Sequence, residues 1–371
     1  MILVITPLPP LRTGIAIYSQ KLYSEIGKHI PLTILTNKKA SKTSKNKTKL
    51  KIIEAWDYNN PLSFLTLIIK LIKNREKLLH LQLGYTWIKN PLITQLLSTL
   101  LLITAKLLKM KIIVTLHGIV TKETLSTYFS AEKRKKAKIL VTILHTIYTI
   151  HYRSLIKISD TIIVHNSNVK RKLFERINQK YKKKIVVIPH GVDTQLFAPN
   201  PPDKHLMEKF NLHGKKVILY IGRLTKEKGI HYLIQAVKLV TKKIKDVCLL
   251  VVGEGPLRNS LKKIVHRLDG HIKLIGTVSS NNIPRFFSIC DVFVAPSIST
   301  KHFVEPFGMV YLEAMACGKP IVAFDIPAPV RHIIVNGETG YLVPEKDVNM
   351  LVKRICELLM DDKKRFIIGE K

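Results

Sequence analysis

Two carboxylates flank the start of a predicted helix in the segment EPFGMVYLEAMACG, which runs from Glu305 to Gly318. Pro306 suits the first turn of a helix, because its missing N–H group would have no helical partner there, and Gly308 lets a ligand approach the backbone closely. The N–H groups and the dipole at a helix N-terminus favour an anion such as phosphate, and Glu313 can accept hydrogen bonds from ligand hydroxyls. The segment therefore predicts a site for a phosphorylated, hydroxyl-rich ligand, although a solvated amphipathic helix would show the same spacing.

The same pair of carboxylates raises the alternative of glycoside hydrolysis, which uses an acid and a nucleophile. A helix rises about 1.5 Å per residue, so Glu305 and Glu313 would lie about 12 Å apart along its axis. Hydrolysis needs two carboxyl groups roughly 5 to 9.5 Å apart. A continuous helix through both residues therefore argues against a hydrolytic pair.

A second candidate site is the segment YIGRLTKEKG, in which Arg223 and Lys228 follow a predicted strand and precede a predicted helix. Arginine offers a rigid fork of donors and lysine a compact charge, and together they could offset the charge on a leaving nucleoside diphosphate. The chain contains no Asp-x-Asp motif. We therefore expect neither a metal nor another cofactor. The alternative for the segment YIGRLTKEKG is a solvated basic turn.

The elements that must position these residues alternate between strand-like and helical runs, which is typical of a parallel sheet covered by helices. Ligands of such sheets bind outside the carboxyl ends of the strands. The sequence predicts two Rossmann-like α/β domains that face a cleft. Strands are expected at 2–5, 32–36, 78–83, 111–116, 161–165 and 185–188, then at 216–221, 247–252, 272–275, 292–295 and 320–324, and the first helix is expected at 18–29.

Three prolines, Pro199, Pro201 and Pro202, interrupt this alternation in a short polar stretch. We place a domain boundary there, between residues 1–195 and 196–371. The longest apolar run, 92–108, is interrupted by polar residues and is short for a membrane span, so it predicts a buried crossover helix. Residues 37–49 are nearly all Lys, Ser, Thr and Asn and predict a mobile surface loop.

The chain of 371 residues carries a formal net charge of +35, and that charge is uneven. Residues 1–200 hold 34 Lys and Arg against 9 Asp and Glu, whereas residues 201–371 hold 27 against 17. Such a field attracts nucleic acid, anionic lipid or phosphorylated substrates, and composition does not choose among them or exclude a merely solvated lysine surface. The aromatic residues do not interleave with the basic runs, so no specific nucleic-acid partner is predicted.

The four cysteines are widely separated and form no C-x-x-C pair, which indicates small buried side chains in a reducing compartment. The apolar N-terminus is too short for a signal peptide. These features predict a cytoplasmic protein. The basic segments 133–136 and 180–184 allow peripheral attachment to an anionic membrane at its inner face.

The EPFGMVYLEAMACG segment resembles, over its whole length, the signature of the retaining glycosyltransferases of family 4, which have the GT-B fold. The resemblance implies that Glu305 lies beside the donor sugar and that Glu313 binds the ribose of the nucleotide. It also implies donor contacts from Phe307, Gly308 and Met309.

Other segments carry the same resemblance along nearly the whole chain. YIGRLTKEKG is similar to the family's G-R-L-x-x-x-K-G pattern, which implies that Arg223 and Lys228 bind the donor diphosphate. His117 matches the family's histidine and is expected to position the donor sugar rather than to act as a base. Gly14, in the loop PPLRTGIA, is assigned a contact to donor or acceptor, although the family loop usually has two adjacent glycines.

Two departures from the family pattern affect what the resemblance implies. Residues 326–333 read IPAPVRHI, where the family commonly has a Gly-Gly pair and then Pro-Glu, so donor selectivity is not predicted. The sequence stops at Lys371, where family members continue into helices that cross back onto the N-terminal domain. We therefore expect that the closing C-terminal helix is missing or that the sequence is incomplete.

The resemblance implies transfer of a hexosyl group from a UDP-, GDP- or ADP-linked sugar, as co-substrate, to a hydroxyl of a glycan or lipid-linked acceptor. The N-terminal domain would take the acceptor and the C-terminal domain the donor, in polysaccharide, glycolipid or lipid-linked glycan synthesis. The residues assigned to catalysis are Glu305, His117, Arg223 and Lys228. Two alternatives stay open: a sugar-nucleotide epimerase or phosphorylase of the same architecture, and a non-catalytic polyanion-binding protein.

Overall fold

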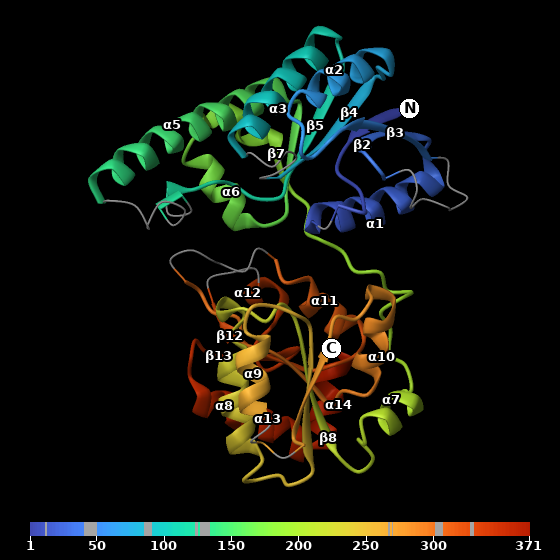
Figure 1. Cartoon of the computed structure of the whole chain (residues 1–371), viewed down its shortest axis with the longest axis vertical. Helices are drawn as coiled ribbons and strands as arrows, with labels where there is room; N and C mark the ends of the chain where they lie inside the picture. The colour runs from blue at the N-terminus through green and yellow to red at the C-terminus, as the bar shows by residue number, and fades with distance from the viewer. Residues whose placement is uncertain are drawn as a thin grey trace. The chain divides into compact units, whose positions relative to one another are not determined.

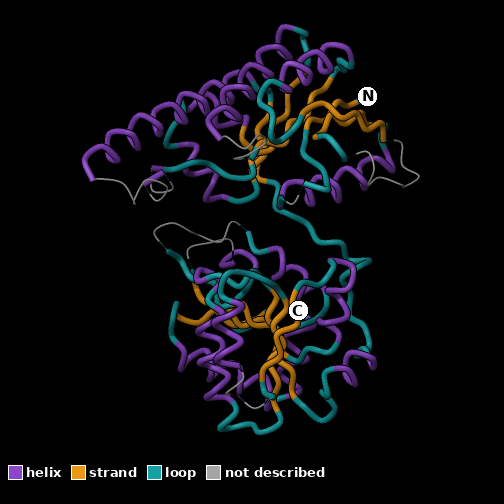
Figure 2. Tube along the Cα trace, viewed as in Figure 1, coloured by secondary structure: helices purple, strands orange, loops and turns teal. Residues whose placement is uncertain are grey.

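The computed structural model describes residues 1–11, 13–40, 50–84, 91–122, 125–126, 134–265, 268, 270–300, 307–326 and 330–371. The chain divides into two compact units, Met1–Pro189 and His190–Lys371 (Figure 1). Each unit has its own parallel sheet with helices on both faces, as Figure 2 shows for strands and helices. The predicted fold class, two Rossmann-like α/β domains, is confirmed.

The N-terminal unit alternates strands and helices from its first residues. Its elements are β1 (Ile2–Ile5), α1 (Gly14–His29), β2 (Leu32–Asn37), β3 (Leu50–Trp56), α2 (Ser63–Lys73), β4 (Leu78–Leu83), α3 (Pro91–Leu107), β5 (Lys111–Leu116), α5 (Arg134–Ile158), β6 (Thr161–Val164), α6 (Ser167–Phe174), the 3₁₀ helix η2 (Gln179–Lys184) and β7 (Ile185–Val187).

The N-terminal sheet has the strand order β3-β2-β1-β4-β5-β6-β7 within the described residues, with every pairing parallel. The order reverses between β1 and β4, so right-handed crossovers place α1 on one face and α2, α3 and α5 on the other (Figure 1). The two faces of the sheet each have a hydrophobic core, and alternate residues of β1 belong to different cores. Leu3 and Ile5 pack in the core under α2, α3 and α5, and Val4 packs with Tyr23 of α1 in the other core.

The C-terminal unit repeats this construction with a smaller sheet. Its elements are α7 (Lys204–Lys209), β8 (Lys216–Ile221), the 3₁₀ helix η3 (Lys226–Lys228), α8 (Ile230–Val240), β9 (Val247–Val252), α9 (Arg258–Val265), β10 (Ile272–Gly276), the 3₁₀ helix η5 (Ser280–Asn282), α10 (Ile283–Ser288), β11 (Val292–Ala295), α11 (Met309–Ala316), β12 (Ile321–Asp325), α12 (Val330–Ile333), β13 (Gly340–Pro344), α13 (Val348–Met360) and α14 (Asp362–Glu370).

The C-terminal strands are ordered β10-β9-β8-β11-β12-β13 and are all parallel in the part of the chain that the structure describes. The strands of this sheet are mostly apolar, although β8 begins with Lys216, β10 contains Lys273 and β12 ends at Asp325. Strand β9 is buried at every residue, because helices cover both faces. The order reverses between β8 and β11. The carboxyl ends of these two strands therefore form the switch point at which open α/β sheets bind ligands.

The last two helices pack together at the end of the C-terminal unit. Glu357 of α13 accepts hydrogen bonds from Lys364 of α14, from Arg354 at 2.7 Å and from Tyr341 at 2.9 Å. Burial raises the pKa of Glu357, but these three donors outweigh burial and bring that pKa to about 2. The carboxylate is therefore a charged anchor between α13, α14 and β13.

Several predicted boundaries and burials differ from the structure. The first helix begins at Gly14 rather than residue 18, because Thr13 caps it by accepting from the amide of Ala16 at 3.1 Å. Strands β3 and β13 were not predicted. The run 92–108 forms the crossover helix α3 between β4 and β5, as predicted, but the helix is buried on one face only, since Leu101 and Leu102 are buried whereas Leu96 is 73% exposed.

The cysteines, the loop 37–49 and membrane spans were also subjects of prediction. All four cysteines are free and buried, as predicted. Most of the predicted loop 37–49 lies outside the described residues, and Asn37 is the last residue of β2. The described residues include one helical stretch, Lys138–Ile158 of α5, that is long and apolar enough to cross a membrane by length and composition alone, and 39% of its apolar window is buried.

Candidate active site

The switch point of the C-terminal sheet gathers three loops whose backbones touch. The loop after β8 contains Gly222, whose amide donates to Val252 at 3.0 Å, and Gly253 follows β9 directly. A Cβ atom on Gly253 would lie 1.9 Å from the carbonyl oxygen of Gly222, and one on Gly255 would lie 2.5 Å from that of Leu224. Only glycine permits this approach, so these residues hold the β8 and β9 loops together.

The loop after β11 joins the same cluster through Gly229. Gly229 has φ 66° and caps α8, and a Cβ there would lie 1.7 Å from the carbonyl oxygen of Pro296. The amide of Ile298 donates to the carbonyl of Glu227 at 2.9 Å, which ties the two loops a second time. The N-terminus of α8 is therefore fixed against the loop that leads toward α11.

Arg223 and Lys228 both lie in the loop after β8, at the carboxyl edge of the sheet, as the sequence predicts. The Tyr220 hydroxyl donates to the carbonyl of Arg223 at 2.9 Å, which pins the backbone of that loop. The Arg223 side chain is exposed and has no acidic partner among the described residues. Lys228 is half-buried at the end of η3, directly before Gly229. The structure thus places two cations in the segment that leads from β8 into α8.

Two helices begin at this edge with glycine caps. Gly229 precedes α8 and Gly308, with φ 81°, precedes α11, and within the described residues neither helix has a side-chain cap. Uncapped first turns leave amide groups that attract anions. Thr225 is 8% exposed, and its hydroxyl is buried and has no hydrogen-bond partner in the described part of the chain. The edge therefore combines cations, helix N-termini and a buried hydroxyl, a suitable set of groups for a diphosphate.

The predicted carboxylate segment is described only from Phe307 onward. Helix α11 begins at Met309, after Gly308, and carries Glu313 one turn in, half-buried. The Phe307 ring is buried and lies edge-on to the His190 ring of the same unit, with centroids 4.5 Å apart. Glu305 and the predicted first-turn Pro306 lie outside the described residues. The distance of about 12 Å between Glu305 and Glu313 assumed one continuous helix through both residues. That assumption does not hold, because α11 begins at Met309, four residues after Glu305.

The switch point of the N-terminal sheet holds Gly14, the first residue of α1. A Cβ on Gly14 would meet no atom within 4 Å, so its glycine leaves open space beside the backbone. Gly84 follows the neighbouring strand β4, and a Cβ there would lie 1.9 Å from the side chain of Ile15. The start of α1 is thus packed against the end of β4, which positions the Gly14 backbone.

His117 directly follows β5 and ends a chain of buried hydrogen bonds. Its Nε2 lies 2.7 Å from Gln82 Oε1, Gln82 Nε2 lies 2.7 Å from the Tyr23 hydroxyl, and that hydroxyl lies 3.0 Å from His80 Nδ1. The last bond joins His80 Nε2 to Thr115 at 2.8 Å. Burial lowers the pKa of His80 to about 4 and raises that of Tyr23, so both are neutral near pH 7.

The direction of this chain fixes the tautomer of His117. Gln82 Nε2 donates to the Tyr23 hydroxyl, and Gln82 Oε1, which can only accept, must then accept from His117 Nε2. The proton of a neutral His117 is therefore on Nε2, and its Nδ1 is an acceptor. This orientation suits the positioning role that the sequence assigns to His117.

Two further rings at this edge were missed by the sequence reading. His165 directly follows β6 as His117 follows β5, and their ring centroids are 4.9 Å apart. Tyr18 of α1 lies edge-on to both rings, at 4.9 and 5.3 Å. Burial lowers the pKa of His165, although its bond to the Ile188 carbonyl acts in the opposite direction. The signal was the repeated histidine one residue past a strand.

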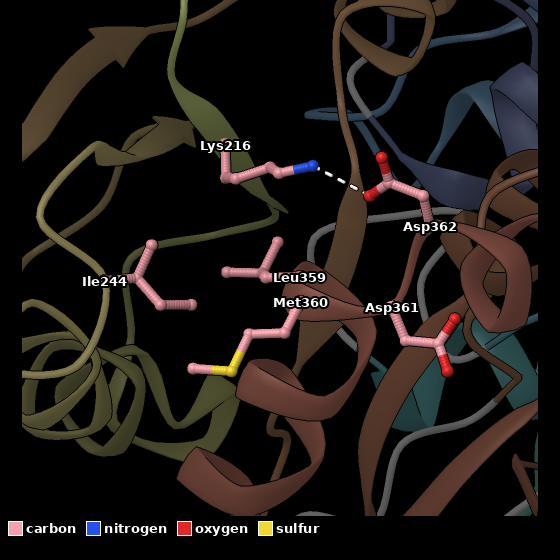
Figure 3. Close-up of a pocket in the computed structure, with 6 residues that line it drawn as sticks. All are labelled: Lys216, Ile244, Leu359, Met360, Asp361 and Asp362. Carbon is pink, nitrogen blue, oxygen red and sulfur yellow. Dashed lines mark hydrogen bonds and ion pairs between the residues drawn. The ribbon is translucent and has the colours of Figure 1, made fainter.

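The hollow in Figure 3 lies at the opposite end of the C-terminal sheet. It is lined by Lys216, the first residue of β8, and by Ile244, Leu359, Met360, Asp361 and Asp362. Lys216 and Asp362 form an ion pair at 2.8 Å across it. Because ligands of parallel sheets bind at the carboxyl ends of the strands, we give this hollow no role in the site.

Two family models match almost the whole chain. Residues 14–196 match the model described as Glycosyltransferase Family 4, and residues 203–371 match that described as Glycosyl transferases group 1. The chain belongs to glycosyltransferase family 4. The family resemblance stated from the sequence is thereby confirmed, and the matched regions correspond closely to the two units.

Curated relatives match over about half of their length and half of this chain. A GDP-mannose-dependent alpha-(1-6)-phosphatidylinositol monomannoside mannosyltransferase of Mycolicibacterium smegmatis is 31% identical over 187 residues, 49% of each chain. The capsular polysaccharide biosynthesis glycosyltransferase CapM of Staphylococcus aureus is 31% identical over 217 residues, 56% of this chain and 54% of that protein.

Solved structures share the fold at lower identity. Anabaena Alr3699/HepE in complex with UDP has a TM-score of 0.72 and 18% identity, covering 100% of this chain and 93% of that one. WaaG, a glycosyltransferase involved in lipopolysaccharide biosynthesis, has a TM-score of 0.68 and 12% identity, covering 100% and 93%. These structures show that the chain has the fold of GT-B glycosyltransferases.

Proposed function

We propose that this protein transfers a hexosyl group from a nucleoside diphosphate sugar to an acceptor hydroxyl, with retention at the anomeric carbon. The observation that carries the proposal is the C-terminal switch point, where Arg223 and Lys228 precede the glycine-capped start of α8 and where α11 begins at the same edge of the sheet with a second glycine cap. Family membership supports it, as do relatives whose names describe glycosyl transfer. Relatives and neighbours named with GDP-mannose and with UDP support a nucleotide donor and do not choose its base.

The proposed reaction needs stabilisation of a leaving group more than a strong base. The acceptor oxygen forms a bond to the anomeric carbon while the bond from that carbon to the phosphate oxygen breaks, and its electron pair goes to the diphosphate. The acceptor proton passes to the same phosphate oxygen, on the same face of the sugar. Arg223, Lys228 and the helix N-termini would neutralise the growing charge without a metal.

The remaining residues have supporting roles in this proposal. Glu313 would bind the ribose, Phe307, Gly308 and Met309 would line the donor, and Gly14 would leave room for a ligand at the N-terminal switch point. His117, held by Gln82, would orient a sugar hydroxyl. Glu305 would support the sugar, and this role stays a prediction from the resemblance.

A glycan or lipid-linked acceptor fits the proposal, and we propose cytoplasmic action as a peripheral protein at the inner membrane face. The names of relatives that act on phosphatidylinositol mannoside or in capsule synthesis support such acceptors. The basic residues of the N-terminal half support an anionic surface as partner.

The test is release of nucleoside diphosphate from UDP-, GDP- and ADP-linked sugars, with and without membrane lipid extract. Lys228→Ala should lower kcat by about 100- to 1,000-fold, because it removes a group that stabilises developing charge. Lys226→Ala is the matched control, since Lys226 is an exposed lysine in the same 3₁₀ turn and should leave kcat within about twofold of wild type. Near-normal turnover of Lys228→Ala would remove the diphosphate assignment.

The same assay separates the two rival functions. An epimerase would interconvert the sugar nucleotide with no acceptor present and without net release of nucleoside diphosphate. A polyanion-binding protein would release none under any condition and would show salt-sensitive affinity for nucleic acid. Acceptor-dependent release would favour transfer over both.

A further inference from the structure

Helix α2 carries an apolar stripe on its outward face. Leu65, Ile69 and Ile72, with Leu62 just before the helix, are all exposed, and Leu65 is 62% exposed. Their spacing of three, four and three residues places them on one side of the helix. The opposite side buries Phe64, Leu67 and Leu71 in the core. This helix is therefore apolar on both its inner and its outer face.

Helix α3 carries a second stripe with the same geometry. Its exposed residues are Leu96, Leu100, Ile103 and Leu107, at spacings of four, three and four. Its buried face near the start is polar instead, with Thr94, Gln95 and Ser98 almost fully buried. Burying polar groups while exposing leucine reverses the usual order of a water-facing helix. The outer face of α3 thus suits an apolar environment.

Helix α5 carries the third stripe, formed by Ile139, Ile143, Ile147 and Ile150, together with Leu140. Its other side supplies core residues of the unit, and a hydrogen bond of 2.7 Å between His151 and Thr99 joins it to α3. A helix so committed to the core cannot leave to span a bilayer without unfolding the unit. The apolar length of α5 is therefore better explained by a surface role.

The three stripes form one surface, which we call the three-helix face. All three helices lie on the same side of the N-terminal sheet, and α3 contacts both α2 and α5 (Figure 1). Each stripe is about 15 Å long at about 1.5 Å per residue, and packed helices lie about 8 to 10 Å apart. More than half of the large exposed hydrophobic side chains in the described residues belong to this face. Its breadth matches a flat partner rather than a single inserted helix.

The charge around the three-helix face selects the partner. The sequences of α2, α3 and α5 contain no Asp or Glu. Exposed basic residues stand on all three helices: Lys73 on α2, Lys106 on α3, and Lys138, Arg153 and Lys157 on α5. Asp160, just past α5, pairs with Lys106 at 3.7 Å, so one of these charges is partly offset. An apolar surface with a basic border is the pattern of a protein that lies in the interface of an anionic bilayer.

We propose that the three-helix face docks the protein on an anionic lipid bilayer, with the apolar stripes in the headgroup boundary and the basic residues on lipid phosphates. This surface differs from the basic segments 133–136 and 180–184 that the sequence suggested, because it is the apolar stripes that bind. Docking on the bilayer would bring the proposed transferase to lipid-linked acceptors. Only this last step rests on the proposed function. Vesicle binding itself requires no donor.

The test is co-sedimentation of the full chain with vesicles of phosphatidylcholine alone or mixed with phosphatidylglycerol. Wild type should bind the anionic vesicles, and more weakly as salt rises. The triple variant Leu65→Gln, Leu100→Gln, Ile143→Gln changes one exposed residue on each helix and should bind at least about tenfold more weakly. The control triple variant Met360→Gln, Phe366→Gln, Ile367→Gln changes exposed residues of the C-terminal unit and should bind as wild type does.

The circular dichroism spectrum and the nucleotide affinity of the first triple variant should equal those of wild type. An equal spectrum would show that the variant is folded, and an equal affinity would show that the loss of docking leaves the donor site intact. Equal vesicle binding by both triple variants would overturn the proposal, as would no binding by wild type. A wild-type dimer in size-exclusion chromatography that the first triple variant abolishes, without any vesicle binding, would overturn it in favour of a second copy of the chain. A charge-reversed Lys73→Glu, Lys138→Glu, Lys157→Glu variant should lose the preference for anionic over neutral vesicles.

Discussion

Gly229→Ala should both destabilise the C-terminal unit and weaken the proposed diphosphate site. The alanine would need φ 66°, which costs about 1 to 2 kcal/mol for a residue with a Cβ. Its Cβ would also start 1.7 Å from the carbonyl oxygen of Pro296, and forcing such a contact apart typically costs about 1 to 3 kcal/mol. The expected loss in the free energy of unfolding is therefore about 2 to 5 kcal/mol.

Gly214→Ala separates the two parts of that cost. Gly214 has φ 73° and is exposed, and a Cβ there would meet no atom within 4 Å. This control should lose only the backbone part, about 1 to 2 kcal/mol, and should leave nucleotide binding unchanged. Gly229→Ala should also weaken nucleoside diphosphate binding, because the loop after β8 must move away from the loop after β11.

The assay is urea unfolding followed by circular dichroism, with calorimetric titration of UDP and GDP on the same samples. The difference between the two alanine variants measures the clash alone. If Gly229→Ala were as stable as Gly214→Ala and bound nucleotide as wild type does, the close packing of these two loops would be refuted.

Two further predictions concern titration and positioning. The pKa of Glu357 is lowered from 4.5 to about 2, so the contribution of this carboxylate to stability is complete above pH 4.5 and is lost as pH falls toward 2. The melting temperature of Glu357→Gln should therefore depend less on pH across that interval than the melting temperature of wild type. An equal pH dependence of the two melting temperatures would contradict the role of Glu357 as an anchor. Gln82→Leu removes the acceptor of His117 and the donor to Tyr23, and it should lower the free energy of unfolding by about 1 to 3 kcal/mol. Gln82→Glu should restore an acceptor and raise the pKa of His117 in an NMR titration. An unchanged titration of His117 in that variant would show that residue 82 does not hold the His117 ring.

Much of the architecture follows from the sequence because buried parallel strands are continuous apolar runs between polar turns. β3 escaped this rule because its sequence, LKIIEAW, carries Lys51 and Glu54 and lies at the sheet edge beside a lysine-rich stretch. β13 was not predicted because its five residues begin with Gly340 and end with Pro344 and so give little pattern, and it also lies at an edge. Edge strands are only partly covered, so their composition resembles that of loops.

The candidate site was predictable in its charged residues and not in its supports. Arg223 and Lys228 stand out as cations past a strand, whereas the contact between Gly229 and Pro296 depends on how loops far apart in sequence pack. The hydrogen-bond chain from His117 through Gln82 also joins strands that meet only in the sheet. The three-helix face was hidden because an apolar run such as 92–108 reads as core, and sequence does not reveal which face of the helix meets the sheet.

The most direct test of the central claim is calorimetric titration of nucleoside diphosphates into the wild type and into the Arg223→Ala, Lys228→Ala double variant. If the C-terminal switch point holds the diphosphate, the double variant should bind UDP or GDP about 100-fold or more weakly, since two charge-assisted contacts are each worth about 1.5 to 3 kcal/mol. The affinity for the corresponding nucleoside should be unchanged. Equal affinity of wild type and double variant for the diphosphate would contradict the site.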